Sequence, residues 1–181
     1  DLSTPDVVGF AERRRLHEGE MAGVLRSKHM LAAEGIEVPI VSCGYSATWN
    51  ITPHVSPEIT DVQVGSYVLM DWAYRELEGM EPFRCALSVL TTVISRNEGK
   101  GGKRHVAVTD CGIKSIATEH TADYGRKALP KVKDLPGAEV IVHSEEHGQI
   151  QLDEATFGRV RLGDRIELIP PHCCSTCNLH D

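Results

Sequence analysis

Residues 172–177, near the end of the chain, carry one imidazole and three thiols, at His172, Cys173, Cys174 and Cys177. Imidazole nitrogen and thiolate sulfur are the ligands that zinc prefers in proteins. This tail follows a strand-like run, and in an extended chain alternate side chains share one face. We therefore expect His172 and Cys174 to bind a metal together, leaving coordination positions open to water or substrate, as a catalytic zinc requires.

Two other interpretations of this tail stay open. Cys174 and Cys177 form a C-x-x-C pair, which is typical of half a zinc knuckle or of a redox dithiol. The three thiols could also be simple buried or solvent-exposed cysteines without a metal. The other cysteines stand singly among apolar residues and are expected to be small core side chains: Cys43, Cys85 and Cys111.

A second candidate is the turn Ser42–Ser46, where a glycine flanked by hydroxyls follows a strand pattern. Backbone N–H groups in such a turn can hold a phosphate, although an ordinary turn explains it as well. A third is Ser144–Gly148, with two acids and a histidine. Those acids could hydrogen-bond a metal-binding histidine, or the stretch could be the solvated end of a hairpin. Asp110–Lys114 closes a strand tightly and is expected to be structural.

Composition places the chain among ordinary globular proteins. Its 181 residues suffice for one domain or two small ones, and they are 41% hydrophobic and 25% charged. The net charge of -7 does not indicate nucleic-acid binding. We expect the short basic clusters 13–15 and 100–104 to be solvated surface. No apolar run approaches the length of a membrane span.

The cysteine content and the N-terminus bear on where the protein works. Six cysteines without a secretory signal predict reduced thiols in the cytoplasm. The chain begins at Asp1 without an initiator methionine, so we expect it to be a piece of something longer.

The first part of the chain alternates helix with strand. Residues 4–35 show a helical period, with Gly35 as a natural C-cap. Strand patterns follow at 36–42 and 59–71, separated by a Gly/Ser turn, and this alternation is typical of an α/β unit. The helix is expected to begin with a Ser3 or Thr4 cap and Pro5 in its first turn, and to bury one face made of Met21, Val24, Leu25 and Leu31.

The second part of the chain consists of strands and turns with little helix. The strand patterns are 86–95, 106–110, 140–144 and 165–169, with turn residues between them. The organisation therefore changes near residue 80, which predicts two different kinds of domain.

Five stretches of the sequence resemble the motifs of one enzyme family, in the same order. Residues 41–48 resemble V-S-G-G-(G/S)-T-P-T, and residues 64–71 resemble P-G-T-Y-V-F-M-D. Residues 110–115 resemble D-A-G-S-K-A, and residues 144–148 match S-E-E-H-G. The tail, 171–179, resembles P-N-H-x-C-P-T-x-N-L.

Over residues 40–181 the chain is thus similar to the D-serine dehydratase / D-threonine aldolase family of pyridoxal-phosphate enzymes, relatives of alanine racemase. The resemblance implies an α/β plus β fold: a (β/α)8 barrel that carries the cofactor, followed by a mostly antiparallel β domain that carries the metal. We accordingly predict residues 1–78 to be the last units of such a barrel and 79–181 to be the β domain.

The resemblance also implies the cofactors and their ligands. Pyridoxal 5'-phosphate would be held at its phosphate by Gly44, Tyr45 and Ser46, and Zn²⁺ by His172 and Cys174. The expected reaction is the elimination of water from a small D-3-hydroxy amino acid, as in D-serine dehydratase, which gives a keto acid and ammonia. The alternatives are D-threonine aldolase-type retro-aldol cleavage, a D-threo-3-hydroxyaspartate dehydratase, and a non-catalytic metal-binding module.

Three departures from the family qualify this implication. The family's Schiff-base lysine lies near the start of the barrel, and no lysine here has that context, so an N-terminal segment or second chain is expected to supply it. The stretch 112–114 lacks the tyrosine that alanine racemase uses as an acid/base, which disfavours racemisation. Tyr45 and Ala47 replace the usual glycine and proline of the phosphate turn. Homodimerisation is expected from the resemblance alone.

Overall fold

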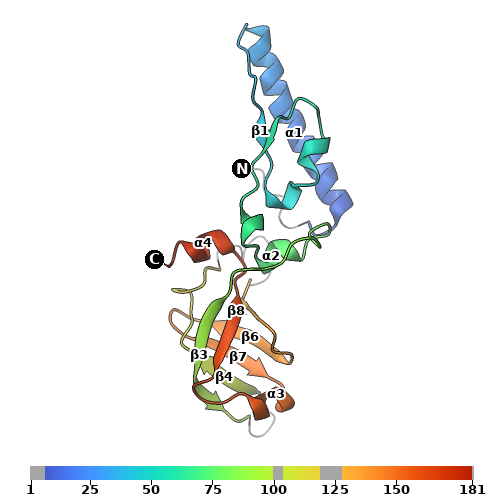
Figure 1. Ribbon diagram of the computed structural model, residues 1–181. Helices are drawn as coiled ribbons and strands as arrows, with labels where there is room; N and C mark the ends of the chain where they lie inside the picture. Colours follow the sequence, from blue (N-terminus) through green and yellow to red (C-terminus); the bar gives the residue numbers. More distant parts are fainter. Residues whose placement is uncertain (1–6, 100–103, 119–127, 181) are drawn as a thin grey trace. The chain divides into compact units, whose positions relative to one another are not determined.

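The computed structural model describes residues 7–99, 104–118 and 128–180 (Figure 1). The predicted caps Ser3 and Thr4, with Pro5, and most of the basic cluster 100–104 lie outside the described residues. The chain forms two compact units. Unit 1 runs to Val68 and includes Tyr74–Arg84, and unit 2 comprises Leu69–Ala73 and the chain from Cys85 onward.

Unit 1 is organised around one long helix. Helix α1 (Phe10–Ala33) confirms that the predicted helix exists, but it begins later than expected, with Gly9 as its N-cap rather than Ser3 or Thr4. Gly35, at φ +78°, ends it with its amide bonded to the Ala32 carbonyl at 3.0 Å. A short parallel pair follows, in which Ser42 of β1 lies opposite Asp61 of β2. The other elements are short: β1 (Ser42–Cys43), η1 (Ser46–Thr48), η2 (Thr52–His54), β2 (Asp61–Val62) and η3 (Ser66–Val68).

The predicted strands 36–42 and 59–71 are therefore wrong in length. Pro39 removes a backbone donor from the first. In the second, the amides of Gly65 and Tyr67 donate to the Ser46 hydroxyl at 3.3 and 3.2 Å, so the chain turns there instead of pairing with a strand.

The buried face of α1 also differs from the prediction. It consists of Arg13, His17 and Met21, whereas Leu31 is 41% exposed. The Arg13 guanidinium donates to the carbonyls of Ala47 at 3.0 Å and Val8 at 2.9 Å. The expectation that the cluster 13–15 is solvated thus fails for Arg13, because these loop carbonyls supply buried acceptors, and holds for Arg14 and Arg15, which form exposed ion pairs.

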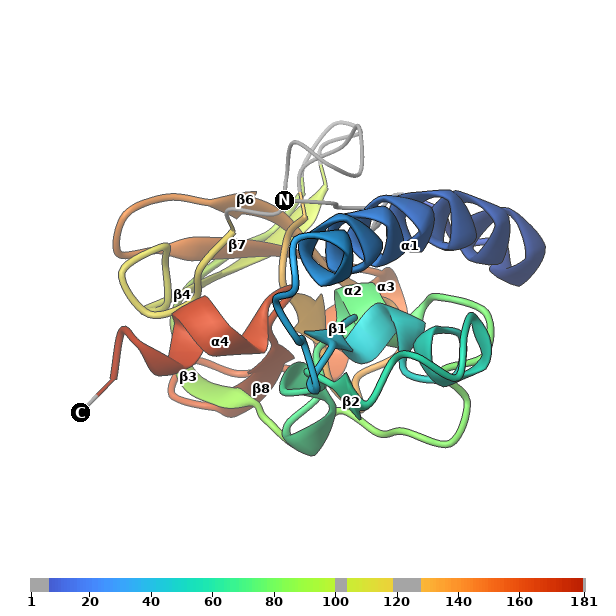
Figure 2. The ribbon, with the colours of Figure 1, turned by 90° about the horizontal axis from the view of Figure 1, so that it is seen from above.

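Unit 2 is built on a six-stranded, fully antiparallel sheet, which confirms the predicted antiparallel β domain. The strand order is β5-β8-β3-β4-β7-β6, and the edge strands β5 and β6 lie near each other, so the sheet curves toward a barrel (Figure 2). The strands are β3 (Val89–Asn97), β4 (His105–Thr109), β5 (Lys131–Val132), β6 (Ala138–His143), β7 (Gly148–Leu152) and β8 (Arg165–Ile169).

Alternation along these strands creates the core of unit 2. In β7, Gly148, Ile150 and Leu152 are buried while the two glutamines between them are half-buried, as expected when successive side chains point to opposite faces. The apolar core unites these positions with others from every long strand: Val93, Ala107, Val140, Ile150, Leu152, Ile166 and Leu168, joined by Cys111, Ile116 and Val160.

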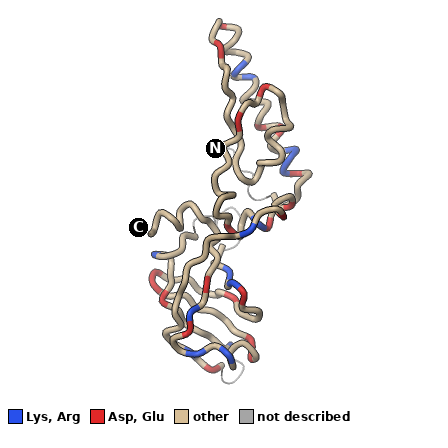
Figure 3. The backbone as a smooth tube through the Cα atoms, in the orientation of Figure 1, with Lys and Arg blue, Asp and Glu red and all other residues tan. Residues whose placement is uncertain are grey.

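Three short helices complete the described elements: α2 (Trp72–Arg75), α3 (Glu154–Arg159) and α4 (Cys173–Cys177). Asp153 caps α3 by accepting the Thr156 amide at 2.7 Å. Within the described residues, no helix has both the length and the apolarity needed to cross a bilayer. Figure 3 shows acidic and basic residues interspersed along both units.

Unit 1 therefore contains a helix and a parallel strand pair, as an α/β unit should. That these are the last units of a (β/α)8 barrel stays a prediction, as does the division into residues 1–78 and 79–181.

The end of β4 yields a prediction about stability. The Asp110 carboxylate accepts the Thr92 amide and the buried Thr91 hydroxyl, both at 2.7 Å, and the Thr92 bond is the largest cause of its lowered pKa. In Asp110→Ala the buried hydroxyl loses its acceptor, so the free energy of unfolding should fall by about 1–3 kcal/mol in urea titrations. In a Thr91→Val background, which has no buried hydroxyl at this position, Asp110→Ala should lower the free energy of unfolding by less.

The same interaction makes a pH-dependent contribution. Because folding lowers the Asp110 pKa below its ordinary 3.8, the carboxylate stabilises the fold above that value. The contribution should disappear as the pH falls below 3.8 through the lower folded-state pKa. Asp110→Ala should consequently lose less stability than the parent chain over this acid range, and identical acid unfolding curves would contradict the assignment.

Candidate functional site

The tail of unit 2 is a one-turn helix rather than an extended chain. β8 ends at Ile169, two prolines follow, and His172 is the N-cap of α4 with extended backbone at φ -138° and ψ 117°. The expectation that His172 and Cys174 share a face because the chain is extended is therefore wrong. Cys174 lies in the first turn of a helix, whose start is fixed by the Cys173 amide donating to the Asp71 carboxylate at 3.1 Å.

The two predicted ligands lie in different environments. Cys174 is exposed, and His172 is half-buried with its Nδ1 3.0 Å from the Ser175 hydroxyl. The neighbouring Cys173 is 2% exposed, and burial, together with the nearby Asp71, raises its pKa to about 12, so its sulfur stays a thiol at neutral pH. An exposed thiol two residues from an imidazole that is hydrogen-bonded at Nδ1 provides the donor types that a divalent zinc-like ion prefers.

In the described part of the chain, no group of three or more His, Cys, Asp or Glu side chains is placed to hold a metal. His172 and Cys174 are two donors of the types that zinc prefers, and a catalytic zinc keeps a coordination position open for water or substrate.

Two loops of unit 2 hold the tail in place. The Ala117 amide donates to the Thr176 hydroxyl at 3.3 Å, and His180 Nε2 lies 2.8 Å from the Ser115 carbonyl. The loop that carries Ser115 is itself fixed to the hairpin end 144–148, since the Ile113 amide donates to the Ser144 carbonyl at 2.8 Å. Hydrogen bonds therefore connect the tail, the loop around Ser115 and the hairpin end.

Glycine is required where these two loops meet. A Cβ on Gly112 would lie 2.5 Å from the Glu145 carbonyl carbon, closer than real contacts allow. Glu145 and Glu146 are exposed, and Glu146 pairs with Lys114 at 2.5 Å, so the interpretation of 144–148 as a solvated hairpin end agrees with the structure.

His143 is not among the residues predicted from the sequence. It stands four residues before His147, and this H-x-x-x-H spacing is the signal that could have indicated it. Both of its ring nitrogens are buried, and burial is the largest cause of its lowered pKa, which disfavours the charged ring. His147 is exposed at the hairpin end.

In unit 1, the predicted phosphate turn is a tight bend closed by side-chain hydroxyls. Gly44 has φ +77°, and a Cβ there would overlap the Thr52 side chain, with Cγ2 at 2.9 Å. The Tyr45 amide donates to Thr48 Oγ1 at 3.2 Å. The buried Ser46 hydroxyl accepts hydrogen bonds from the amides of Gly65 and Tyr67. The bend therefore joins the first two sequence motifs.

A buried polar chain supports this bend. His17 Nε2 lies 2.8 Å from Thr52 Oγ1, which donates to Thr48 Oγ1 at 3.0 Å. A rigid, glycine-containing bend fits the backbone needs of a phosphate site. The contacts of Tyr45 and Ser46 are internal to the chain, however, so their direct contact with a phosphate stays a prediction.

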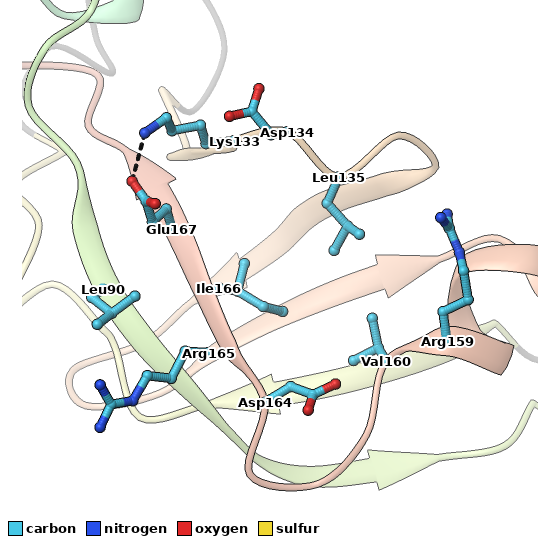
Figure 4. A pocket seen from close by; sticks show the side chains of 10 residues that line it. All are labelled: Leu90, Lys133, Asp134, Leu135, Arg159, Val160, Asp164, Arg165, Ile166 and Glu167. Atoms are coloured by element: carbon cyan, nitrogen blue, oxygen red, sulfur yellow. Dashed lines mark hydrogen bonds and ion pairs between the residues drawn. The ribbon is translucent and has the colours of Figure 1, made fainter.

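Two open hollows lie on unit 2. The first has a volume of about 410 Å³ and a rim of mixed charge around Ile166, with Lys133 and Glu167 paired at 2.7 Å (Figure 4). It contains none of the predicted site residues. The second, of about 490 Å³, lies beside α4 and is lined by Leu87, Ser88, Val89, Leu90, Thr176, Cys177 and His180.

Comparisons with known proteins give a consistent result. The family model described as "Putative serine dehydratase domain" matches residues 86–181. The 3-hydroxy-D-aspartate aldolase of Paracoccus denitrificans is 31% identical over 95% of this chain and 42% of its own length. The D-threo-3-hydroxyaspartate dehydratase of Delftia sp. is 30% identical over 97% of this chain and 47% of its own length. The chain thus spans less than half of these relatives.

Solved structures agree on the fold. The D-threonine aldolase of Filomicrobium marinum superposes with a TM-score of 0.82 at 24% identity, over 98% of this chain and 44% of that one. The Delftia dehydratase superposes with a TM-score of 0.75 at 28% identity, over 99% and 48%. Its structures include a cysteine-to-alanine mutant in the metal-free form and a mutant of a histidine two residues earlier.

The bend in unit 1 yields a prediction with two internal controls. Gly44→Ala should destabilise unit 1 for two reasons: about 1–2 kcal/mol of left-handed backbone strain, and the overlap with Thr52. Gly35 has nearly the same φ but open space around it, so Gly35→Ala should be destabilised by the backbone strain alone. Gly65→Ala should be destabilised by neither cause. Urea unfolding followed by circular dichroism should rank the losses in that order; equal losses at Gly44 and Gly35 would refute the close packing.

Proposed function

The chain belongs to the family of the serine dehydratase domain, as the five motifs indicated, and from this premise we propose that it forms part of a pyridoxal-phosphate- and zinc-dependent lyase acting on D-3-hydroxy amino acids. Its reaction is the elimination of water to give a keto acid and ammonia. The chain contributes the metal ligands from unit 2 and part of the cofactor's phosphate site from unit 1.

The observation that carries this proposal is the pair His172 and Cys174, an oriented imidazole and an exposed thiol two residues apart at the start of α4. The Delftia relative has a histidine and a cysteine with the same order and spacing, and its cysteine mutant is in a metal-free form. This correspondence supports metal binding by His172 and Cys174. Zinc is the ion that such a nitrogen and sulfur pair prefers.

The chemistry divides between the bound groups and the chain. A divalent cation supplies Lewis acidity at the β-hydroxyl of the substrate. Pyridoxal phosphate supplies an electron sink that acidifies the Cα–H. His172 and Cys174 would hold that cation, and the bend at Gly44, Tyr45 and Ser46 would hold the phosphate end of the cofactor. The lysine that attaches the cofactor is expected from an N-terminal segment or a second chain, and the complete enzyme is expected to be a homodimer.

Retro-aldol cleavage, as in D-threonine aldolase, is the second candidate, because the relatives include both aldolases and dehydratases. The same ligands could assist deprotonation of the β-hydroxyl, giving glycine and an aldehyde. The His-x-Cys pair favours dehydration, since the aldolase branch of the family often has aspartate at the second position. A non-catalytic metal-binding module is the remaining alternative.

Metal content separates these ligands from the C-x-x-C interpretation. Purified with zinc and dialysed, the parent chain should keep about one ion, and His172→Ala and Cys174→Ala should keep less than about a tenth of that by mass spectrometry. Cys177→Ala removes an equally exposed thiol from the same helix and should bind normally. A loss at Cys177 equal to that at Cys174 would indicate a knuckle instead.

Product analysis tests the reaction. Co-purified with the lysine-bearing polypeptide that we expect, the protein should convert D-threo-3-hydroxyaspartate to oxaloacetate and ammonia in equal amounts. Cys174→Ala should lower kcat/KM by about 100- to 1000-fold, because the Lewis acid provides several kcal/mol, while bound cofactor absorbance persists. Glycine and glyoxylate as products would establish the aldolase alternative, and a zinc-loaded but colourless, inactive protein would establish the binding module.

A further inference from the structure

The Ser175 hydroxyl lies 3.0 Å from Nδ1 of His172, one of the two proposed metal ligands. We propose that Ser175 is a positioning residue that accepts Nδ1–H of His172 and so leaves Nε2 as the nitrogen that would bind a metal, an inference that rests on the proposed metal role.

The geometry of α4 brings the two side chains together. His172 is the N-cap and Ser175 is the third helical residue, so the hydroxyl lies across the first turn, 3.0 Å from Nδ1. The backbone on either side is held independently, because the His172 carbonyl accepts the Thr176 hydroxyl at 2.7 Å and the Cys173 amide is bonded to Asp71. Rotation of the imidazole is the motion that Ser175 restricts.

The direction of this hydrogen bond decides which nitrogen can bind a metal. A neutral imidazole carries one proton, and the nitrogen without it is the ligand. If Nδ1–H donates to the Ser175 oxygen, the lone pair is on Nε2, on the opposite side of the ring. If the serine hydroxyl donates instead, Nε2 carries the proton and cannot coordinate. Metal binding at Nε2 therefore requires that Ser175 accept.

This arrangement has the physical form of an outer contact to a metal-binding histidine, in which the second ring nitrogen donates to an oxygen acceptor. Removing such a partner typically costs about 10- to 100-fold in metal affinity. Because Ser175 is half-buried at the surface of a short helix, truncation should leave the fold of unit 2 unchanged.

Zinc affinity and ring tautomer together test the inference. By competition with a chromophoric chelator, Ser175→Ala and Ser175→Pro should each bind zinc at least about 10-fold more weakly than the parent, and Ser175→Thr, which keeps the hydroxyl, should restore binding. Ser27→Ala, which removes an exposed helix hydroxyl in unit 1, is the matched control and should change nothing.

The tautomer is read separately, by ¹⁵N spectra of the histidine-labelled, metal-free chain at a pH of about 8.5, where an ordinary histidine is neutral. The His172 signals, assigned by their loss in His172→Gln, should show the proton on Nδ1 in the parent and a shift toward Nε2–H in Ser175→Ala. A parent ring protonated at Nε2, or a Ser175→Ala ring identical to the parent's, would overturn the inference.

These measurements distinguish two failures. If His172→Ala and Cys174→Ala still bind zinc, the proposed metal site is wrong, and the tautomer comparison still decides whether Ser175 orients the ring. If both variants lose zinc but Ser175→Ala binds it as tightly as the parent does, the metal site stands and the role of Ser175 is refuted.

Discussion

The candidate metal site depends on one hydrogen bond, from the Cys173 amide to the Asp71 carboxylate 102 residues earlier in the chain. Both residues are almost completely buried, Asp71 at 1% and Cys173 at 2% exposure. A five-residue helix is too short to be stable alone, and its first amides have no partner within it. The buried carboxylate supplies that partner and places negative charge at the helix N-terminus.

Asp71 can do this because its own segment is fixed in unit 2. The chain enters unit 2 for only five residues, Leu69–Ala73, before returning to unit 1. The Trp72 amide donates to the Pro170 carbonyl at 3.3 Å, the Trp72 indole donates to the Leu129 carbonyl at 3.1 Å, and the Lys131 ammonium lies 4.4 Å from the ring centroid. The five-residue segment Leu69–Ala73 therefore determines where helix α4 begins.

This long-range dependence explains what sequence could and could not predict. The strand patterns of β3, β4, β6 and β8 are local, and the sheet of unit 2 confirms these segments as strands. The start of α4 is set by a residue 102 positions away, so no local pattern reveals it. The same holds in unit 1, where the sequence pattern alone predicts Arg13 to be a surface charge. In the folded chain, backbone carbonyls accept hydrogen bonds from its guanidinium, and these bonds offset the cost of burying the charge.

The choice between two adjacent cysteines shows why this matters for the chemistry. The sequence presents Cys173 and Cys174 with equal ligand character, and ligand spacing alone does not distinguish their sulfurs. Because Asp71 accepts the amide of Cys173, that residue begins the helix with its thiol buried, and the raised pKa keeps this sulfur protonated. The next residue, Cys174, is exposed, and His172 is half-buried. The carboxylate at 71 thus fixes which residue begins the helix, with the thiol of Cys173 inside and that of Cys174 accessible to a metal.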